Sequence, residues 1–244
     1  MKTCIVVPTY NEALNLPKLV TAIFDLPLPD LNILVVDDNS HDGTGKIAEE
    51  LGQKNDGRVN VLKRPGKMGL GTAYIQGFKK ALEEGAEAVC QMDADFSHPP
   101  EKIVELLQAL KDCDVALGSR YVAGGALDER WPLWRKALSG WGNYYARTIL
   151  GLPMRDVTGG FRMWHSRTLK GMPLERIRSN GYIFQVEMAY VAHLLGYRFN
   201  EVPIYFADRR WGQSKMSLRI QIEAAFRVWQ LPGMYRDLRR TQAA

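Results

Sequence analysis

Short apolar runs alternate with segments of helical periodicity along the first half of this chain, and this alternation limits the fold more strongly than any other feature. The runs are rich in β-branched side chains, as buried strands are, and cover residues 2–7, 31–38, 59–62 and 88–92. The expected helices between them cover residues 14–23, 44–51 and 69–82, with Asn11 as the expected N-cap of the first. This alternation predicts an α/β fold with a mostly parallel central sheet, right-handed crossovers and flanking helices.

The second half of the chain has the same kinds of element in a less regular order. The pattern predicts helices over residues 103–110, 131–150 and 182–195. It predicts strands over residues 114–117 and 197–206. No internal repeat or linker divides the 244 residues, a length that one large domain can occupy. We therefore expect one domain over residues 1–216 and a basic amphipathic segment over residues 217–244.

Polar clusters follow three of the expected strands, at residues 8–12, 37–38 and 93–95. Ligands of parallel α/β sheets bind outside the carboxyl ends of the strands, so the three clusters should share one edge. Asp37 and Asp38 either bind a base or ribose by hydrogen bonds or cap the turn before Gly43.

Asp93 and Asp95 form the most informative cluster. Residues two apart in extended backbone point to the same face, so the two carboxylates can converge. Like charges at that separation repel unless a cation or protons neutralise them, and hard oxygen ligands suit Mg²⁺ or Mn²⁺. The pair therefore predicts a divalent metal that holds a diphosphate, with a solvated acidic turn as the alternative. His98 adjoins the pair, where it would orient the carboxylates rather than bind metal.

Three further segments combine glycine with charged side chains. Residues 64–72, which include Lys67 and Gly69, lack the dinucleotide and Walker A spacings and form either an anion-binding helix N-terminus or a plain loop. Residues 209–215 suit phosphate binding, or form a solvated basic loop. The Gly pair within residues 156–162 indicates either a ligand wall or a tight turn.

Two helical segments carry polar or basic side chains in a regular pattern. Arg135, Ser139 and Asn143 recur at every fourth position and lie on one stripe of their expected helix. Residues 217–240 mix apolar side chains with five arginines. Such a segment lies either in a membrane interface or packed on the domain as a terminal helix.

Charge and cysteine content bear on partners and compartment. A formal charge of +5 and a pI near 9.1 favour anionic partners, among which nucleic acid, acidic lipid and nucleotides all qualify. Three cysteines without metal-like spacing indicate reduced core residues in a cytosolic protein. The apolar runs are too short for a signal peptide or a transmembrane helix, so any membrane contact should be peripheral.

Taken in order, these motifs resemble the GT-A glycosyltransferases of family 2, and more narrowly the dolichol-phosphate or polyprenol-phosphate mannose synthases. The resemblance is carried in the first half by residues 8–12, 36–44, 69–73 and 92–99. It continues through residues 118–121, 156–162, 181–187 and 209–215, and so spans roughly residues 3–217. Residues 1–216 are then expected to be a GT-A catalytic domain.

The resemblance implies a donor site for GDP-mannose. Its guanine and ribose pocket would be lined by Pro8, Tyr10, Glu12 and Asp37. Further donor contacts are implied for Asp38, Lys67, Gly69, Asp93, Ala94, Asp95 and Lys215. Asp93, Asp95 and Ser97 would hold Mg²⁺ or Mn²⁺ on the diphosphate, although many relatives have Gln at the position of Ser97.

The resemblance also implies an acceptor site for a polyprenyl (dolichyl) phosphate, formed by Arg120, Arg135, Ser139 and Arg209. A phosphate oxygen of this lipid would attack mannose C1 with inversion, which gives β-mannosyl phosphopolyprenol and GDP. The acceptor is already an anion, so no general base is required, and the metal and arginines stabilise the transferred charges. The expected catalytic set is Asp93, Asp95, Arg120 and Arg209.

Some members of this family append transmembrane helices, whereas this sequence ends at Ala244 after its amphipathic segment. We expect peripheral association with the cytoplasmic face of a membrane, through residues 217–244 or a small membrane-anchoring subunit, and no nucleic acid partner.

Four alternatives stay open at this point. A polyprenyl-phosphate glucosyltransferase using UDP-glucose would have the same metal and lipid-phosphate motifs. Residues 93–97 superficially resemble the aspartyl-nucleophile motif of haloacid-dehalogenase-type phosphatases, although that motif is expected after the first strand. A receiver-like module, suggested by Asp37 and Asp38, would be about half this length. A non-catalytic regulatory subunit would not need both metal carboxylates.

Overall fold

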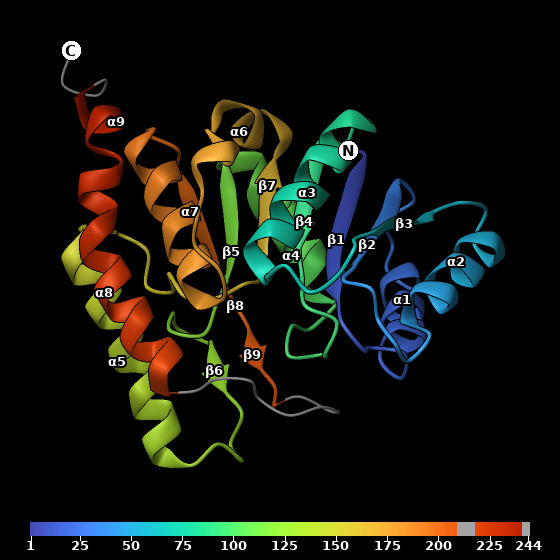
Figure 1. Cartoon of the computed structure of the whole chain (residues 1–244), viewed down its shortest axis with the longest axis horizontal. Helices are drawn as coiled ribbons and strands as arrows, with labels where there is room; N and C mark the ends of the chain where they lie inside the picture. Colours follow the sequence, from blue (N-terminus) through green and yellow to red (C-terminus); the bar gives the residue numbers. More distant parts are fainter. Residues whose placement is uncertain (209–217, 241–244) are drawn as a thin grey trace.

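The centre of the molecule is a mostly parallel sheet. A computed structural model describes residues 1–208 and 218–240, with side chains described over residues 1–208 and 225–238. Within these ranges the sheet has seven strands in the order β3-β2-β1-β4-β7-β5-β8 (Figure 1). The strands are β1 (Thr3–Thr9), β2 (Leu31–Asp37), β3 (Val59–Lys63), β4 (Ala88–Gln91), β5 (Val115–Ser119), β7 (Arg162–His165) and β8 (Phe199–Pro203).

Four of these strands confirm the predicted parallel core. β1 pairs in parallel with both β2 and β4, and β2 pairs in parallel with β3. Successive side chains of a strand point to opposite faces, so Ile5 and Val6 enter two different hydrophobic cores. Burial on both faces explains why these strands are continuous apolar runs in the sequence.

β7 is a strand that the apolar pattern did not predict. It runs antiparallel between β4 and β5, and so keeps β5 parallel to β4. Its four residues are too few to show a period, and they begin with Arg162, which is fully buried. The carbonyl oxygens of Gly159, Gln185 and Val157 accept hydrogen bonds from this guanidinium at 2.8 to 3.0 Å, which is why a cation is tolerated there.

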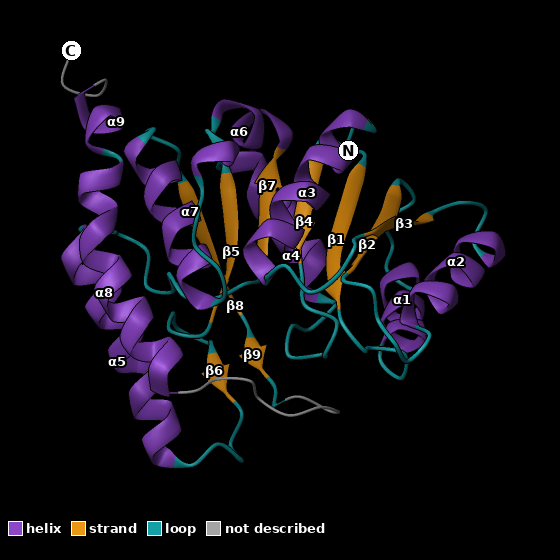
Figure 2. Cartoon of the chain, viewed as in Figure 1, coloured by secondary structure: helices purple, strands orange, loops and turns teal. Residues whose placement is uncertain are grey.

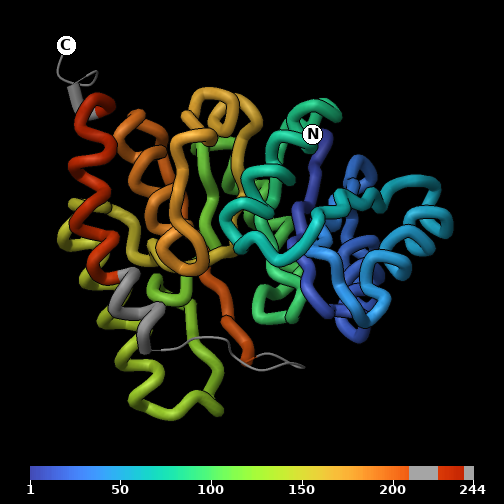
Figure 3. Tube along the Cα trace, viewed as in Figure 1, coloured from blue at the N-terminus to red at the C-terminus, as the bar shows by residue number. Residues whose placement is uncertain are grey.

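Helices cover both faces of the sheet (Figure 2). One face packs against α1 (Leu16–Phe24), α2 (Thr44–Lys54) and α4 (Lys102–Ala109). The core on the other face includes side chains of α3 (Leu70–Glu83), α5 (Leu133–Leu150), α6 (Ser166–Gly171), α7 (Tyr182–Leu194) and α8 (Leu218–Met234), and α8 packs on α5 and α7. The remaining helical elements are α9 (Arg236–Arg240) and two short 3-10 helices, Leu110–Asp112 and Leu174–Arg176. The N-terminal strands and the C-terminal helices lie on opposite sides of the molecule (Figure 3).

The first helix begins later than expected, and the prediction that Asn11 caps it was wrong. Asn15 is the N-cap residue, and Pro17 occupies the first turn, where its missing N–H costs nothing. Asn11 instead has a left-handed backbone with φ of 60°, and its Oδ1 accepts a hydrogen bond from the His41 N–H at 3.0 Å.

The strand expected over residues 197–206 is divided between two sheets. After β8 leaves the central sheet, β9 (Tyr205–Phe206) pairs in parallel with β6 (Ala126–Leu127). Ile204 joins the two, because its N–H donates to the Ser119 carbonyl at 3.0 Å and its carbonyl accepts from the Ala126 N–H at 2.9 Å. This small ladder lies beyond the carboxyl ends of the central strands (Figure 1).

The C-terminal segment packs on the domain through one side of α8. Val228 and Leu231 are buried in the core that α7 helps to form, while Phe226 and Trp229 are exposed. The amphipathic pattern therefore corresponds to one packed side and one exposed side. Among the helices in the described ranges, none is long and apolar enough to span a bilayer.

Candidate active site

The three predicted polar clusters follow β1, β2 and β4 at the carboxyl edge of the sheet, and the loop after β5 lies at the same edge. Thr9, Asp37 and Ser119 are the last residues of β1, β2 and β5, and Asp93 follows β4 by two residues. The hydrogen bond from Thr9 Oγ1 to Asp37 Oδ1, at 3.0 Å, joins two of these strand ends directly.

Asp37 is buried and organises the turn that follows β2. Besides Thr9, it accepts hydrogen bonds from the Ser40 hydroxyl at 2.6 Å and from the Ser40 N–H at 3.1 Å. A Cβ at Gly45 would lie 3.0 Å from Asp37 Oδ2, so the helix that follows approaches the carboxylate closely. Of the two sequence interpretations, the structure shows the turn-capping role of Asp37.

Asp38 forms a buried ion pair with Arg64. The guanidinium donates from Nη1 to Asp38 Oδ1 at 2.6 Å and from Nη2 to Thr72 Oγ1 at 2.5 Å. Burial raises the pKa of Asp38, and the Arg64 charge opposes that rise. These contacts tie the end of β2 to the first turn of α3.

The loops after β1 and β3 bring Tyr10 and Lys67 together. Lys67 Nζ lies 4.9 Å from the centroid of the half-buried Tyr10 ring, within cation–π distance. Gly69 ends the second loop with φ of 100°, and a Cβ there would lie 2.6 Å from Asn180 Oδ1, so this position requires glycine. Pro8 lies within β1, and Glu12 Oε2 accepts a hydrogen bond from Asn15 Nδ2 at 2.7 Å.

Asp93 and Asp95 lie on a tight turn after β4. Tyr74 Oη donates to Asp93 Oδ1 at 2.8 Å, and the Ser97 N–H donates to Asp95 Oδ1 at 3.0 Å. Burial raises the pKa of Tyr74 well above its usual value, and the Asp93 charge adds to the rise, so the phenol stays protonated. Asp93 is half-buried, and Ala94, Asp95 and Ser97 are buried.

His98 holds the backbone of this turn. Its Nδ1 accepts a hydrogen bond from the Asp93 N–H at 3.1 Å, so the ring proton lies on Nε2 in the neutral form. The ring stacks on Phe161 with centroids 5.1 Å apart and planes 9° apart. Burial lowers the pKa of His98, which favours the neutral form despite the two neighbouring carboxylates. The predicted orienting role of His98 therefore acts on the main chain of Asp93.

The carboxylate turn suits a hard divalent cation. The described residues contain no group of three His, Cys, Asp or Glu side chains arranged to hold a metal. Mg²⁺ typically binds one or two protein carboxylates and takes its other ligands from substrate phosphates and water. Asp93 and Asp95 fit that donor set, provided that a phosphorylated substrate completes it.

Arg120 follows β5 and is fixed by Asp156. Its Nε and Nη2 both donate to the Asp156 carboxylate at 2.7 Å, and Nη2 also donates to Thr158 Oγ1 at 2.7 Å. Burial opposes the charged form of both partners, but their attraction holds the pKa of Asp156 below its ordinary value. Residues 156–162 are thus the support for Arg120 rather than a simple turn.

The three polar residues predicted to share one stripe of α5 all contact the rest of the domain. Ser139 Oγ and Tyr121 Oη are hydrogen-bonded at 2.8 Å, and the Tyr121 ring lies 5.2 Å from the Arg120 guanidinium carbon. Arg135 lies 3.6 Å from the Trp131 ring centroid and pairs with Asp208 at 3.3 Å. Asn143 accepts a hydrogen bond from the Val157 N–H at 2.8 Å. Arg209 and Lys215 lie outside the described residues.

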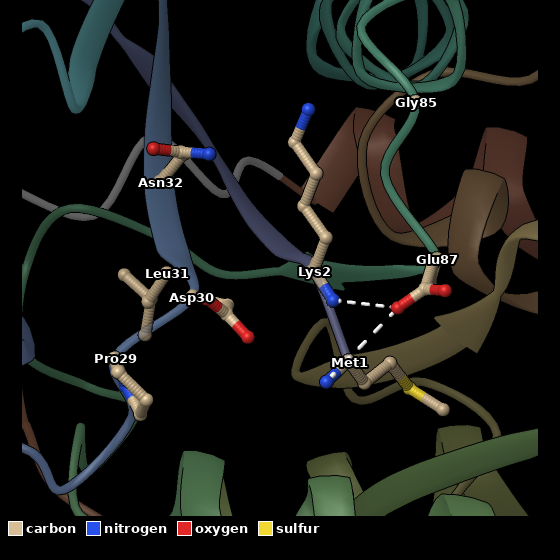
Figure 4. Close-up of a pocket in the computed structure, with 8 residues that line it drawn as sticks. All are labelled: Met1, Lys2, Pro29, Asp30, Leu31, Asn32, Gly85 and Glu87. Carbon is tan, nitrogen blue, oxygen red and sulfur yellow. Dashed lines mark hydrogen bonds and ion pairs between the residues drawn. The ribbon is translucent and has the colours of Figure 1, made fainter.

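A hollow elsewhere on the molecule lies away from the carboxylate turn and from Arg120. It lies at the opposite, amino-terminal edge of the sheet (Figure 4). Its lining residues are Met1, Lys2, Pro29, Asp30, Leu31, Asn32, Gly85 and Glu87. Glu87 accepts a hydrogen bond from the Lys2 backbone N–H at 2.7 Å, so its carboxylate helps to anchor the chain start.

Two supporting residues, Tyr74 and Arg64, were missed by the sequence reasoning as individual site residues. Tyr74 lies four positions before Phe78 in α3, so it has the spacing of an ordinary core aromatic. A buried phenol needs a hydrogen-bond partner, and that requirement was the available signal. Arg64 was noted only as one of the cations in a glycine-rich segment.

The fold and the matched sequence place this chain in glycosyltransferase family 2, whose model matches residues 4–172. The chain is 42% identical over 235 residues to a polyprenol monophosphomannose synthase of Mycolicibacterium smegmatis, which covers 95% of this chain and 88% of that protein. It is 43% identical over 241 residues to an undecaprenyl-phosphate mannosyltransferase of Micrococcus luteus, which covers 98% of each.

Solved structures with low sequence identity share the fold, and the predicted GT-A fold is confirmed. The mannosyltransferase PcManGT of Pyrobaculum calidifontis, in complex with GDP-Man and Mn²⁺, has a TM-score of 0.60 at 17% identity and covers 99% of this chain and 69% of that chain. A glucosyl-3-phosphoglycerate synthase of Mycobacterium tuberculosis, in complex with Mn²⁺, UDP and glucosyl-3-phosphoglycerate, has a TM-score of 0.65 at 14% identity and covers 96% and 79%.

Proposed function

We propose that this chain transfers mannose from GDP-mannose to a polyprenyl phosphate, with inversion at C1, and releases β-mannosyl phosphopolyprenol and GDP. The observation that carries the proposal is the similarity over nearly the whole chain to two mannosyltransferases named for polyprenol and undecaprenyl phosphate. The geometry agrees, because a carboxylate turn and a buried cation lie on loops that open at one edge of the sheet.

On the donor side, Asp93 and Asp95, with Ser97 beside them, would hold Mg²⁺ or Mn²⁺ against the diphosphate. A metal bound there supplies charge stabilisation for the departing diphosphate. The complex of PcManGT with GDP-Man and Mn²⁺ supports this choice of donor and metal. The remaining donor contacts are assigned to Pro8, Tyr10, Glu12, Asp37, Asp38, Lys67, Gly69, Ala94 and Lys215.

On the acceptor side, the lipid phosphate would lie against Arg120. The contacts of Arg120 with Asp156 and Thr158 use its Nε and Nη2, so Nη1 takes part in neither contact and is the group that would donate to a phosphate oxygen. Ser139 reaches the same neighbourhood through Tyr121, and Arg135 would exchange Asp208 for phosphate. Arg209 belongs to this set on sequence grounds.

The reaction needs no proton acceptor from the protein. The attacking phosphate oxygen is already anionic, and the diphosphate leaves as an anion, so the task is to bring two negative groups together. Arg120 supplies positive charge at the acceptor side, and its bidentate contact with Asp156 fixes its orientation before substrate arrives. The neutral His98 is consistent with this chemistry, because its role is to hold the turn.

Transfer of labelled mannose from GDP-mannose to a short polyprenyl phosphate tests the proposal. With Mn²⁺ or Mg²⁺ present, we expect Asp95→Asn to lower the rate by on the order of 100-fold or more, because a charged ligand of the metal is lost. Glu101 is an exposed acidic residue just beyond the turn, so Glu101→Gln is the control and should retain activity. Undiminished transfer by Asp95→Asn would contradict the metal assignment.

A donor panel distinguishes the alternative enzyme. GDP-mannose, UDP-glucose and UDP-GlcNAc are offered separately with the same acceptor, and transfer from GDP-mannose alone is the expected result. Transfer only from UDP-glucose would assign the chain as a polyprenyl-phosphate glucosyltransferase instead.

An exposed aromatic face supports peripheral attachment to a membrane. We define this face by Leu133, Trp134, Leu138, Trp141 and Tyr144 of α5 and by Phe226 and Trp229 of α8. Trp229 Nε1 donates to Tyr145 Oη at 2.7 Å and Trp141 stacks on Tyr145 with centroids 5.1 Å apart, so the two helices share one continuous surface. Exposed apolar patches of this kind mark interaction sites, and Trp and Tyr favour the membrane interface.

Cations on the same helices fit an anionic lipid surface. Lys136 and Arg147 belong to α5, and Arg227 belongs to α8. The three cysteines are buried free thiols, which accords with a cytoplasmic location. Peripheral attachment at the cytoplasmic face is therefore our proposal for the cellular location, and a small anchoring subunit stays a prediction from the sequence.

A further inference from the structure

Tyr74 connects the hydrophobic core to the carboxylate turn. Its ring is fully buried in α3, and its hydroxyl reaches Asp93 Oδ1, which lies 19 residues further along the chain. The contact crosses from a helix on one face of the sheet to the loop that follows β4. A core side chain thus bears directly on one of the two proposed metal ligands.

The position of the Tyr74 hydroxyl is fixed by packing. The ring stacks between Phe78, at 5.8 Å between centroids, and Phe184, at 5.9 Å with planes 2° apart. Phenylalanine would fill the same space and would have no polar atom to satisfy. The hydroxyl therefore has a role other than packing, and Asp93 is the acceptor that it contacts.

A neutral donor on one oxygen of a metal-binding carboxylate orients the other oxygen. Arginine or lysine at this place would compete with the metal by neutralising Asp93, whereas a phenol fixes the carboxylate without adding charge. Hydrogen bonds from outside the ligand shell to metal ligands typically change metal affinity by about 10- to 100-fold. His98 holds the Asp93 main chain separately, so Tyr74 acts on the side chain alone.

The same turn of α3 also reaches the other side of the donor site. Thr72 accepts the hydrogen bond from Arg64, which pairs with Asp38 at the end of β2. The start of α3 is therefore linked through Arg64 to the acidic turn after β2, and through Tyr74 directly to the carboxylate turn after β4. A shift of this helix would move both sides of the site together.

We propose that Tyr74 is a positioning residue that orients the Asp93 carboxylate for the divalent cation that accompanies the nucleotide diphosphate. This inference rests on the proposed function, because it requires a metal at Asp93. It adds a residue on α3 to the site that the motif after β4 defines.

The test is calorimetric binding of GDP and Mn²⁺ to the full chain, with no acceptor or sugar present. We expect Tyr74→Phe to weaken apparent Mn²⁺ affinity in the presence of GDP by about 10- to 100-fold, with GDP binding in chelator unchanged. Tyr190→Phe is the matched control, because Tyr190 is also fully buried in this core but belongs to α7. An Mn²⁺ affinity of Tyr74→Phe within twofold of the parent would overturn the inference.

A double variant separates positioning from a general loss of structure. If Tyr74 acts through Asp93, Tyr74→Phe should add little to the loss of Mn²⁺ affinity that Asp93→Asn causes alone. Full addition of the two losses would show that Tyr74 acts elsewhere and would contradict the inference. Parent protein that binds GDP equally with and without Mn²⁺ would contradict the metal assignment in the proposed function, and the inference with it.

Discussion

At the scale of single residues, this site is built from polar groups that reach partners far away in sequence. Arg120 forms a buried ion pair with Asp156, and Asp38 forms one with Arg64. A buried charge needs an opposite charge or hydrogen bonds to compensate for lost hydration, and each of these two pairs supplies both. Sequence motifs could indicate Arg120, but its partner at a separation of 36 residues follows only from the fold.

Replacement of Asp156 should destabilise the protein and change its acid sensitivity. Asp156→Asn leaves the buried Arg120 charge without its anionic partner, and we expect a loss of about 3–5 kcal/mol in the free energy of unfolding. Urea denaturation at neutral pH measures it. Asp237→Asn, which removes an exposed ion pair with Arg176, should change stability little.

The pH dependence follows from the same pair. Burial raises the pKa of Asp156, but Arg120 lowers it further, and the folded-state value lies below the ordinary one. The pair therefore stabilises the fold above the ordinary carboxyl pKa, and this contribution disappears as pH falls through the lowered value. Asp156→Asn should lose stability mainly at neutral pH and show a shallower decline in acid. An unchanged acid decline would contradict this account.

At the scale of elements, α5 has two chemically different sides. Its polar stripe of Arg135, Ser139 and Asn143 faces the domain, while Trp134 and Trp141 are exposed. The sequence spacing predicted the stripe correctly. It did not indicate the exposed side, because tryptophans at helical spacing are normally predicted to be core residues. Their exposure follows only from the positions of the neighbouring helices in the fold.

Loss of the exposed tryptophans of α5 should weaken membrane binding. We expect the double change Trp134→Ser and Trp141→Ser to reduce binding to vesicles of anionic phospholipid by at least about tenfold, since two large apolar side chains no longer insert. Cosedimentation measures the binding. Leu14→Ser is the control, because Leu14 is 67% exposed but lies outside the aromatic face. Equal binding by the double variant and its parent would contradict the membrane proposal.

At the scale of the whole molecule, the sequence predicted the half of the fold in which strands and helices alternate regularly. β1 to β4 and their helices follow from apolar runs and helical spacing, and the shared carboxyl edge follows from parallel topology. The sequence pattern did not predict β7, because this strand is short and contains Arg162. The burial of Arg162 is compensated by carbonyl oxygens from three separate positions. The sequence did not indicate a site role for Tyr74, because its spacing in the helix is that of an ordinary core residue.

The C-terminal segment should be part of the cooperative fold. Leu231 of α8 is fully buried in the core shared with α7, so Leu231→Ala should cost about 2–5 kcal/mol in the free energy of unfolding. Phe226→Ala in the same helix removes a side chain that is 69% exposed and should leave stability nearly unchanged. Urea denaturation compares the two, and equal effects would show that α8 does not contribute to the core.

An edge strand can be exchanged without rebuilding the sheet beside it, and β8 is such a strand, since it pairs only with β5 in the described sheet. The segment that matches the family model ends at residue 172, after β7 and before α7, β8 and α8. The carboxylates of the turn after β4 therefore lie inside the matched segment, together with Arg120, and the exposed side of α8 lies outside it. Proteins that share only the matched segment can therefore differ in the surface that α8 presents without any change to the carboxylate turn after β4.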